Sequence, residues 1–260
     1  MKTKIKILLE GIALPSIIFV VVTLIVSIFF GILGDIFKNV GAFNENSFNA
    51  VLLQGIADII IIPILVPLYI IFKKKYGIVV DKFKISDIRP FIPVAFSICI
   101  ISNILLQYLP VEEENEVSKE IFDLITEYNI YISLIIVSIL IPIVEELLFR
   151  GYFFDAIVVL SNKNIAVIIT SICFAVIHGN ITQGIYAFVA GLFFGYIKSR
   201  YNKVSYTIIM HLIMNFCSIV LVPAVIELTN FRQKMYAIFI CCAILILSIY
   251  RIKVIRRNYG

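Results

Sequence analysis

Two adjacent glutamates and an arginine follow a long apolar run, and their types and spacing favour chemistry. The motif Glu145-Glu146-x-x-x-Arg150 comes directly after the apolar run 130–143. An ionisable side chain inside a bilayer costs about 2.5–3.5 kcal/mol on insertion scales unless it is paired or faces a polar cavity. On a helix, Glu146 and Arg150 are four residues apart and can pair on one face, whereas Glu145 points about 100° away. The spacing therefore separates a paired carboxylate from one that is available for chemistry.

Both histidines of the chain, His178 and His211, also fall in apolar runs. Asn215 follows His211 by four residues, so one helix face presents an imidazole and a carboxamide together. A single buried histidine often only joins two helices by a hydrogen bond. Two histidines in a chain with an embedded glutamate pair favour a shared polar site instead. Because such side chains do not face lipid cheaply, we expect them to converge inside a helix bundle.

Glutamate, histidine and asparagine together indicate hydrolysis of an amide or an ester. A glutamate in a partly dry cavity can take a proton from water as a general base. Histidine and asparagine N–H groups can then bind the oxyanion that forms when this water attacks a carbonyl. The sequence has neither the HExxH motif of common zinc proteases nor the GxSxG motif of serine hydrolases.

A catalytic zinc ion is the alternative to a metal-free site. Glu145, His178 and His211 are a suitable ligand set that leaves one position open for water. The chain offers only two imidazoles, however, and no tight spacing arranges them in advance. Asn215 suits an oxyanion better than zinc. We therefore favour the metal-free mechanism and keep zinc as the possible cofactor.

The elements that position these residues are predicted to be membrane helices. The chain has 260 residues, of which 61% are hydrophobic and 15% are charged, a composition typical of an integral membrane protein. Apolar runs of about 20 residues indicate helices rather than barrel strands. We predict an all-α, polytopic membrane helix bundle that forms a single domain over 1–260. The eight predicted spans are 12–33, 48–72, 91–109, 130–160, 165–178, 181–197, 204–222 and 235–250.

The distribution of lysine and arginine predicts the topology. Basic residues gather before the first span, at 73–89, at 198–203 and after the last span. Both termini are therefore predicted to be cytoplasmic. The segment 112–127 is acidic and is assigned to the outer side, and its apolar spacing indicates a short amphipathic helix on the membrane surface.

A further polar pair lies in the second span, where Gln54 precedes Asp58 by one turn. We interpret Asp58 as a structural contact to another helix, with contact to a substrate as the alternative.

Three motifs in this order resemble the signature of the CPBP family, also called Abi: Glu145-Glu146-x-x-x-Arg150, Phe174-x-x-x-His178 and His211-x-x-x-Asn215. The family includes the type II CAAX prenyl endopeptidases and bacteriocin-processing intramembrane proteases. The resemblance covers about 130–222, which we interpret as the catalytic core helices. The eight-helix topology also fits. Three ordered motifs, each in an apolar segment, are more specific than any one alone.

The resemblance implies endoproteolysis within the membrane. It assigns Glu145 as the base and the histidines and Asn215 as the residues that bind water or the oxyanion, and Glu146 and Arg150 complete the predicted catalytic set. The implied partners are a membrane-associated peptide or protein substrate and the lipid bilayer, with no nucleic acid. The composition, rich in isoleucine, lysine and asparagine, suggests a bacterial plasma membrane. A secreted peptide precursor or a signalling peptide is then a better substrate than a prenylated protein.

Two other function classes stay open at this stage. The protein is alternatively a catalytically silent member of the same family that acts in bacteriocin immunity or as a membrane scaffold, although the intact motifs argue against this. A proton-coupled transporter would also place glutamate and histidine inside a bundle. Such a transporter should show repeated halves with interrupted helices, and the sequence shows no internal repeat.

Overall fold

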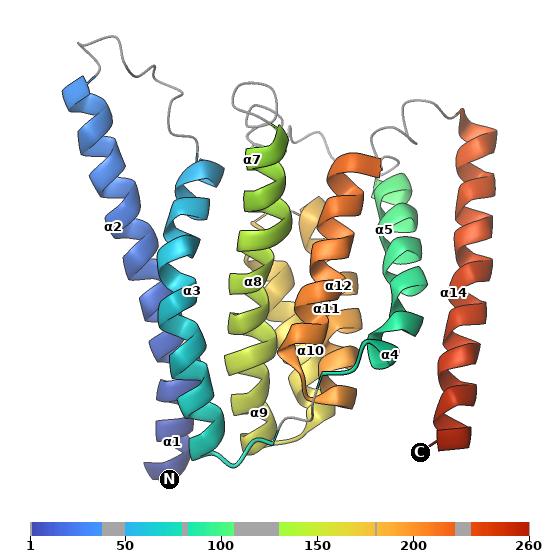
Figure 1. The fold of residues 1–260 in the computed structure, drawn as a ribbon, viewed down its shortest axis with the longest axis horizontal. Coiled ribbons are helices and arrows are strands. Elements are labelled where there is room, and N and C mark those ends of the chain that lie inside the picture. The colour runs from blue at the N-terminus through green and yellow to red at the C-terminus, as the bar shows by residue number, and fades with distance from the viewer. Residues whose placement is uncertain are drawn as a thin grey trace. The chain divides into compact units, whose positions relative to one another are not determined.

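The structure of the protein is a computed structural model that describes residues 2–37, 50–79, 83–106, 130–179, 181–221 and 230–259. Over these residues it contains helices and no strand (Figure 1). Five of the described helices are long and apolar enough to cross a membrane, and they are Lys2–Leu33, Val51–Lys75, Ile85–Leu105, Ile181–Tyr201 and Phe231–Tyr250. The predicted fold class, a polytopic membrane helix bundle, is confirmed.

The remaining predicted spans are helical as well. Lys163–Val176 and Val204–Val220 are shorter apolar helices, and 130–160 is one continuous run of helical segments. The count of eight spans and the cytoplasmic termini stay predictions. The acidic segment 112–127 and its surface helix lie outside the described residues.

The end of the fifth predicted span differs from the expectation. The helix α10 (Lys163–Val176) stops two residues before His178, which lies in a turn. The physical reason is Gly179, whose φ of +73° is a left-handed conformation that ends helices and favours glycine. The last turn tightens at the same point, because the N–H of His178 bonds the carbonyl of Ala175 at 3.3 Å. His178 therefore lies in the turn that follows α10 and not inside the helix.

The chain divides into two compact units, and the division falls inside α10. The first unit comprises Met1–Val79 with Glu113–Thr170, and the second comprises Val80–Glu112 with Ser171–Gly260. The first unit contains α1 (Lys2–Leu8), η1 (Leu9–Ala13), α2 (Leu14–Phe37), α3 (Ala50–Lys75), α7 (Ile130–Ile135), η5 (Ile136–Leu140), α8 (Ile141–Glu146), η6 (Leu147–Phe153) and α9 (Phe154–Leu160). The first helix thus begins ten residues before the predicted start at residue 12, and its N-terminal lysines lie on it.

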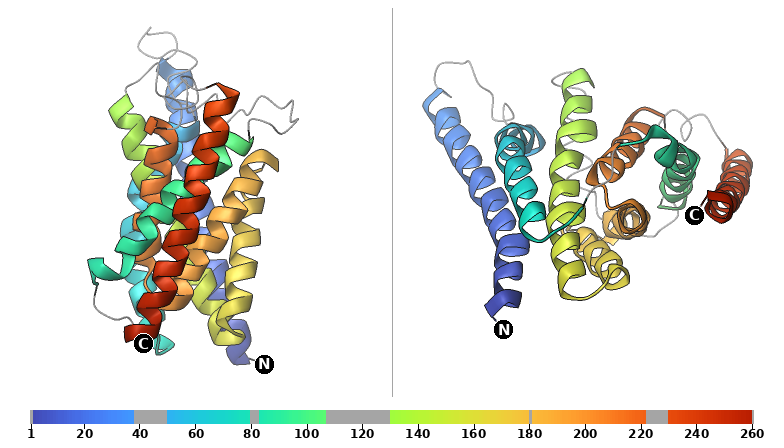
Figure 2. Two further views of the ribbon diagram at one scale, coloured as in Figure 1. Left: turned by 90° about the vertical axis from the view of Figure 1, so that its right-hand side faces the viewer. Right: turned by 60° about the horizontal axis from the view of Figure 1, so that its bottom comes forward.

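In the first unit, α3 lies beside the helical run 130–160 and runs in the same direction (Figures 1 and 2). Contacts in chain order join Gly55 to Ile136, Leu65 to Tyr152 and Tyr69 to Asp155. The Tyr152 hydroxyl donates to the carbonyl of Leu65 at 2.9 Å, and the Tyr69 hydroxyl donates to Asp155 at 2.5 Å. Buried polar groups stay costly unless they are bonded in this way. These bonds therefore fix the register of α3 against the run that carries both glutamates.

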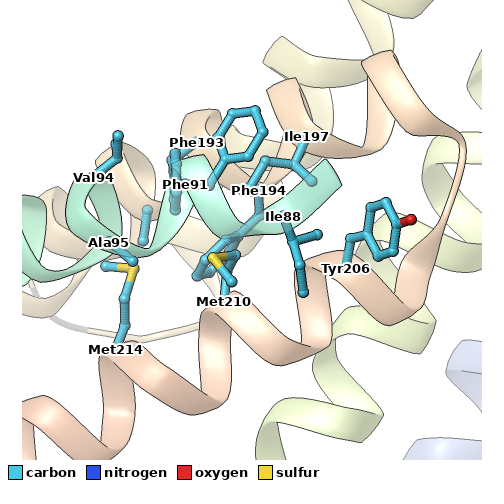
Figure 3. Packing of buried hydrophobic residues seen from close by; sticks show 11 residues of the cluster. Ile88, Phe91, Val94, Ala95, Phe193, Phe194, Ile197, Tyr206, Met210 and Met214 are labelled. Carbon is cyan, nitrogen blue, oxygen red and sulfur yellow. The ribbon is translucent and has the colours of Figure 1, made fainter. Parts of the chain in front are cut away.

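The second unit contains α4 (Ile85–Ile88), η3 (Arg89–Phe91), α5 (Ile92–Leu106), α11 (Ile181–Tyr201), α12 (Val204–Phe216), η7 (Cys217–Leu221) and α14 (Phe231–Tyr259). A buried aromatic and sulfur-rich cluster joins α5, α11 and α12, and Figure 3 shows Met210, Met214 and Phe194 pointing into it. The hydroxyl of Tyr206 lies 2.7 Å from Asp87 and accepts the backbone N–H of Lys84 at 2.9 Å. These contacts fix the start of α12, the helix that carries His211.

Candidate active site

The two glutamates of the motif differ in burial within the first unit. Arg150 donates from Nη1 to Oε1 of Glu146 at 3.1 Å, and both side chains are fully buried. Glu145 is only partly buried. The pairing predicted from the four-residue spacing is confirmed. Because Glu146 is 0% exposed, Glu145 is the one of the two carboxylates with exposed surface.

The backbone around this pair is a π-helix, which the sequence analysis missed. The π-helix η6 starts at Leu147, directly after Glu146, and includes Arg150. A second π-helix, η5, precedes Pro142. Proline lacks an N–H, and its ring crowds the carbonyl four residues earlier, so a wider turn before it relieves the crowding. Wider turns of this kind are rare and are frequently found at functional sites. Pro142 was the only sequence signal for η5, and the sequence carries no corresponding signal for η6.

A third carboxylate lies near Glu145. Asp58 of α3 is 1% exposed, and its Oδ1 accepts a hydrogen bond from Gln54 at 2.7 Å. Asp58 also lies within electrostatic range of Glu145. The sequence showed Gln54 and Asp58 as neighbours on one helix, but it gave no sign that Asp58 lies within electrostatic range of Glu145.

In the second unit, Phe174 packs against both histidines. Its ring is edge-on to His178, with ring centroids 4.8 Å apart, and edge-on to His211 at 5.7 Å. The imidazole of His211 also stacks on Phe194 at 4.8 Å and is 6% exposed. Phe174 was noticed only as part of a motif. Its ring, on α10, contacts the imidazole of His178 in the following turn and the imidazole of His211 on α12.

The hydrogen bond of His178 sets the tautomer of its neutral ring. Nδ1 lies 2.7 Å from the carbonyl oxygen of Phe174. Because a carbonyl only accepts, Nδ1 must carry the hydrogen, and the lone pair of the neutral ring is therefore on Nε2. Nε2 then suits accepting a proton or binding a metal ion better than donating to an oxyanion. Asn215, one turn after His211 and partly buried, has an N–H₂ group that suits the donor role.

Each unit thus brings together part of the predicted set. Glu145, Glu146 and Arg150 lie in the first unit, and the two histidines and Asn215 lie in the second. No group of three or more His, Cys, Asp or Glu side chains placed to hold a metal ion occurs within the described ranges.

Comparison with known proteins agrees with the motif analysis. Residues 127–217 match the family described as "Type II CAAX prenyl endopeptidase Rce1-like", and this stretch contains all six predicted site residues. The resemblance to the type II CAAX prenyl endopeptidase family is confirmed. The match covers the helices from α7 to α12, so it contains the π-helix η6 and the α10 turn.

A curated relative points in the same direction. The chain is 30% identical over 102 residues to the protein named "Putative membrane peptidase YdiL" of Bacillus subtilis (strain 168). This similarity covers 39% of the chain and 41% of the relative, so the chain spans about two fifths of the length of this relative. No solved structure matches the chain.

Proposed function

We propose that this protein is an intramembrane endopeptidase that hydrolyses a peptide bond of a membrane-associated peptide or protein. The observation that carries the proposal is the difference in burial between the two glutamates of the motif. Glu146 is fully buried in an ion pair with Arg150, while its neighbour Glu145 is only partly buried. The match of 127–217 to a family of membrane endopeptidases supports the same reading.

Glu145 acts as the general base in this mechanism. It takes one proton from a water molecule, and the water oxygen forms a bond to the carbonyl carbon of the peptide. The oxyanion that results is stabilised by the N–H₂ group of Asn215. When the intermediate collapses, the C–N bond breaks and the nitrogen receives the proton from Glu145. The products are a carboxylic acid and an amine, and His178 presents Nε2 to the reaction as a hydrogen-bond acceptor.

A zinc ion is the alternative way to activate the water. Glu145, His178 and His211 would hold it, and it would polarise the peptide carbonyl and acidify the bound water. The hydrogen bond from His178 Nδ1 to the carbonyl of Phe174 is typical of histidines that bind metal through Nε2, so this residue fits the role. We keep the metal-free mechanism as the preferred one because Asn215 suits an oxyanion.

The substrate class follows from where the motif residues lie. The glutamates follow the apolar segment 130–143, so a substrate must reach the membrane to be cut. We propose a secreted peptide precursor or a signalling peptide of a bacterial plasma membrane in preference to a prenylated protein. The alternative function is a catalytically silent family member that acts in bacteriocin immunity or as a membrane scaffold.

The deciding experiment is proteolysis by purified protein reconstituted in lipid vesicles. Candidate leader peptides and membrane-anchored, quenched fluorescent peptides are incubated with it, and cleavage is mapped by mass spectrometry. Glu145→Ala should lower turnover by at least about 100-fold while insertion and purification stay normal. Near-normal turnover in Glu145→Ala would disprove the base assignment. Absence of cleavage by the unaltered protein across these peptides would favour the silent alternative.

A double variant tests whether the two units serve one reaction. If Glu145 and His178 act on the same transition state, Glu145→Ala/His178→Ala should be about as slow as the slower single variant, because residues that act as one group are strongly non-additive. Additive losses would mean that His178 acts independently of Glu145.

A further inference from the structure

Asp58 is a buried carboxylate that the proposed mechanism does not yet use. It lies on α3, is 1% exposed and lies within electrostatic range of Glu145. Only one of its oxygens has an evident structural function, since Oδ1 accepts from Gln54 at 2.7 Å. Oδ2 is buried and has no hydrogen-bond partner among the described residues.

The absence of a hydrogen-bond partner for Oδ2 among the described residues argues against a purely structural function of Asp58. A buried polar atom without a partner costs about 1–3 kcal/mol, so a carboxyl kept only for packing would be expected to use both oxygens. Neighbouring residues on the same face of α3, Ala57, Ile61 and Leu65, are fully buried and apolar. An apolar side chain at position 58 would therefore continue this face at lower cost.

Close packing holds Asp58 near the glutamate motif. One turn before it, Gly55 approaches η5 so tightly that a Cβ atom on Gly55 would lie 2.7 Å from Cγ1 of Ile136. Two turns after it, the carbonyl of Leu65 accepts from Tyr152 at 2.9 Å. Both contacts reach the same helical run that carries Glu145, one on each side of the motif. Asp58 is thus fixed from both directions.

We propose that Asp58 is a further catalytic residue that orients the attacking water. This inference rests on the proposed function of Glu145 as the base. A water molecule has two hydrogens, and the base removes only one of them. Oδ2 of Asp58 accepts a hydrogen bond from the second hydrogen, which turns an oxygen lone pair toward the substrate carbonyl. The second hydrogen stays on the water oxygen during attack, and no proton is transferred to Asp58.

The first test is Asp58→Leu, which removes the acceptor and keeps a similar branched shape. We expect kcat to fall about 10- to 100-fold, the usual loss when a hydrogen-bond partner that orients a reacting group is removed. KM should change less than about twofold, and the unfolding temperature in detergent should stay near that of the unaltered protein. These constants are measured with a peptide that the unaltered protein cleaves. Unchanged kcat in Asp58→Leu would overturn the proposal.

A rescue variant separates acceptor chemistry from packing. In Gln54→Glu/Asp58→Asn, the introduced carboxylate at 54 can only accept, so the introduced amide at 58 must turn its N–H₂ toward it and its carbonyl oxygen to the Oδ2 position. Water again finds an acceptor, and we expect kcat to recover about tenfold relative to Asp58→Leu. If the rescue variant is folded and no faster than Asp58→Leu, Asp58 does not act as an acceptor. If Asp58→Leu fails to fold, the rescue variant is compared with the unaltered protein: a kcat within about tenfold of it supports the proposal, and a larger loss in the folded variant overturns it.

The unaltered protein and Glu145→Ala are assayed beside these variants. If Glu145→Ala is inactive and Asp58→Leu works at full rate, only the inference about Asp58 fails. If Glu145→Ala cleaves as fast as the unaltered protein, the proposed function of Glu145 fails and the inference fails with it.

Discussion

Arg150 and Glu146 form an ion pair in which neither side chain has any exposed surface, with Nη1 and Oε1 3.1 Å apart. Removing two charges from water is expensive, and their attraction offsets this only while both partners are present. The pair holds Glu146 in the buried interior of the helical run. Its integrity therefore matters for folding.

Arg150→Ala should destabilise the protein and abolish proteolysis. The substitution leaves the carboxylate of Glu146 buried without its cation, a loss of about 3–5 kcal/mol in a dry site. Thermal unfolding in detergent and cleavage of the reconstituted peptides are the measurements. A variant with wild-type unfolding and no activity would instead place Arg150 in substrate binding.

The matched control is Glu146→Gln/Arg150→Met, which removes both charges and keeps similar volumes. Replacing both partners of a buried pair is often neutral or stabilising. We expect this double variant to unfold at a higher temperature than Arg150→Ala.

The sequence predicted the helical fold and the ion pair because both follow from local spacing. Apolar runs report membrane helices directly, and a four-residue interval places Glu146 and Arg150 on one face. The π-helix η6 was not predictable in this way, because no proline or other local pattern in the sequence marks it.

The contacts that the sequence analysis missed are those between residues far apart in the chain. Asp58 and Glu145 are separated by 87 positions, and no local pattern reports that they approach each other. Phe174 reaches His211 from another helix for the same reason. The helix α10 ends two residues before the predicted end of the span at His178, because the left-handed Gly179 ends the helix there.

His178→Asn and His178→Gln should separate the two nitrogens of His178. An asparagine amide can reproduce Nδ1 and keep the bond to the carbonyl of Phe174, whereas a glutamine amide can reproduce only the position of Nε2. We expect His178→Asn to keep the wild-type unfolding temperature and to lose at least about 100-fold in kcat, because it lacks a group at Nε2. His178→Gln should unfold at a lower temperature and keep more activity. The opposite order of activities would assign the reaction to Nδ1.

Removal of metal should leave activity unchanged if the preferred mechanism holds. Protein is treated with a chelator, dialysed, and assayed with and without added zinc, with elemental analysis of the active fraction. A glutamate base with an Asn215 oxyanion donor needs no ion, so the metal-free preparation should cleave at full rate. Stoichiometric zinc in active protein, loss of cleavage on chelation and recovery with zinc would establish the metal mechanism instead.

Gly55→Ala should destabilise the protein even though alanine favours helices by about 1 kcal/mol over glycine. The added Cβ would lie 2.7 Å from Cγ1 of buried Ile136, and overpacking of this kind costs about 1–3 kcal/mol. Gly31→Ala is the matched control, because a Cβ there meets nothing within 4 Å. Thermal unfolding should rank Gly55→Ala below the unaltered protein and Gly31→Ala level with it or above. Gly55→Ala/Ile136→Ala removes the obstructing atoms and should recover part of the loss. If Gly55→Ala unfolds no earlier than Gly31→Ala, α3 and η5 are not in close contact.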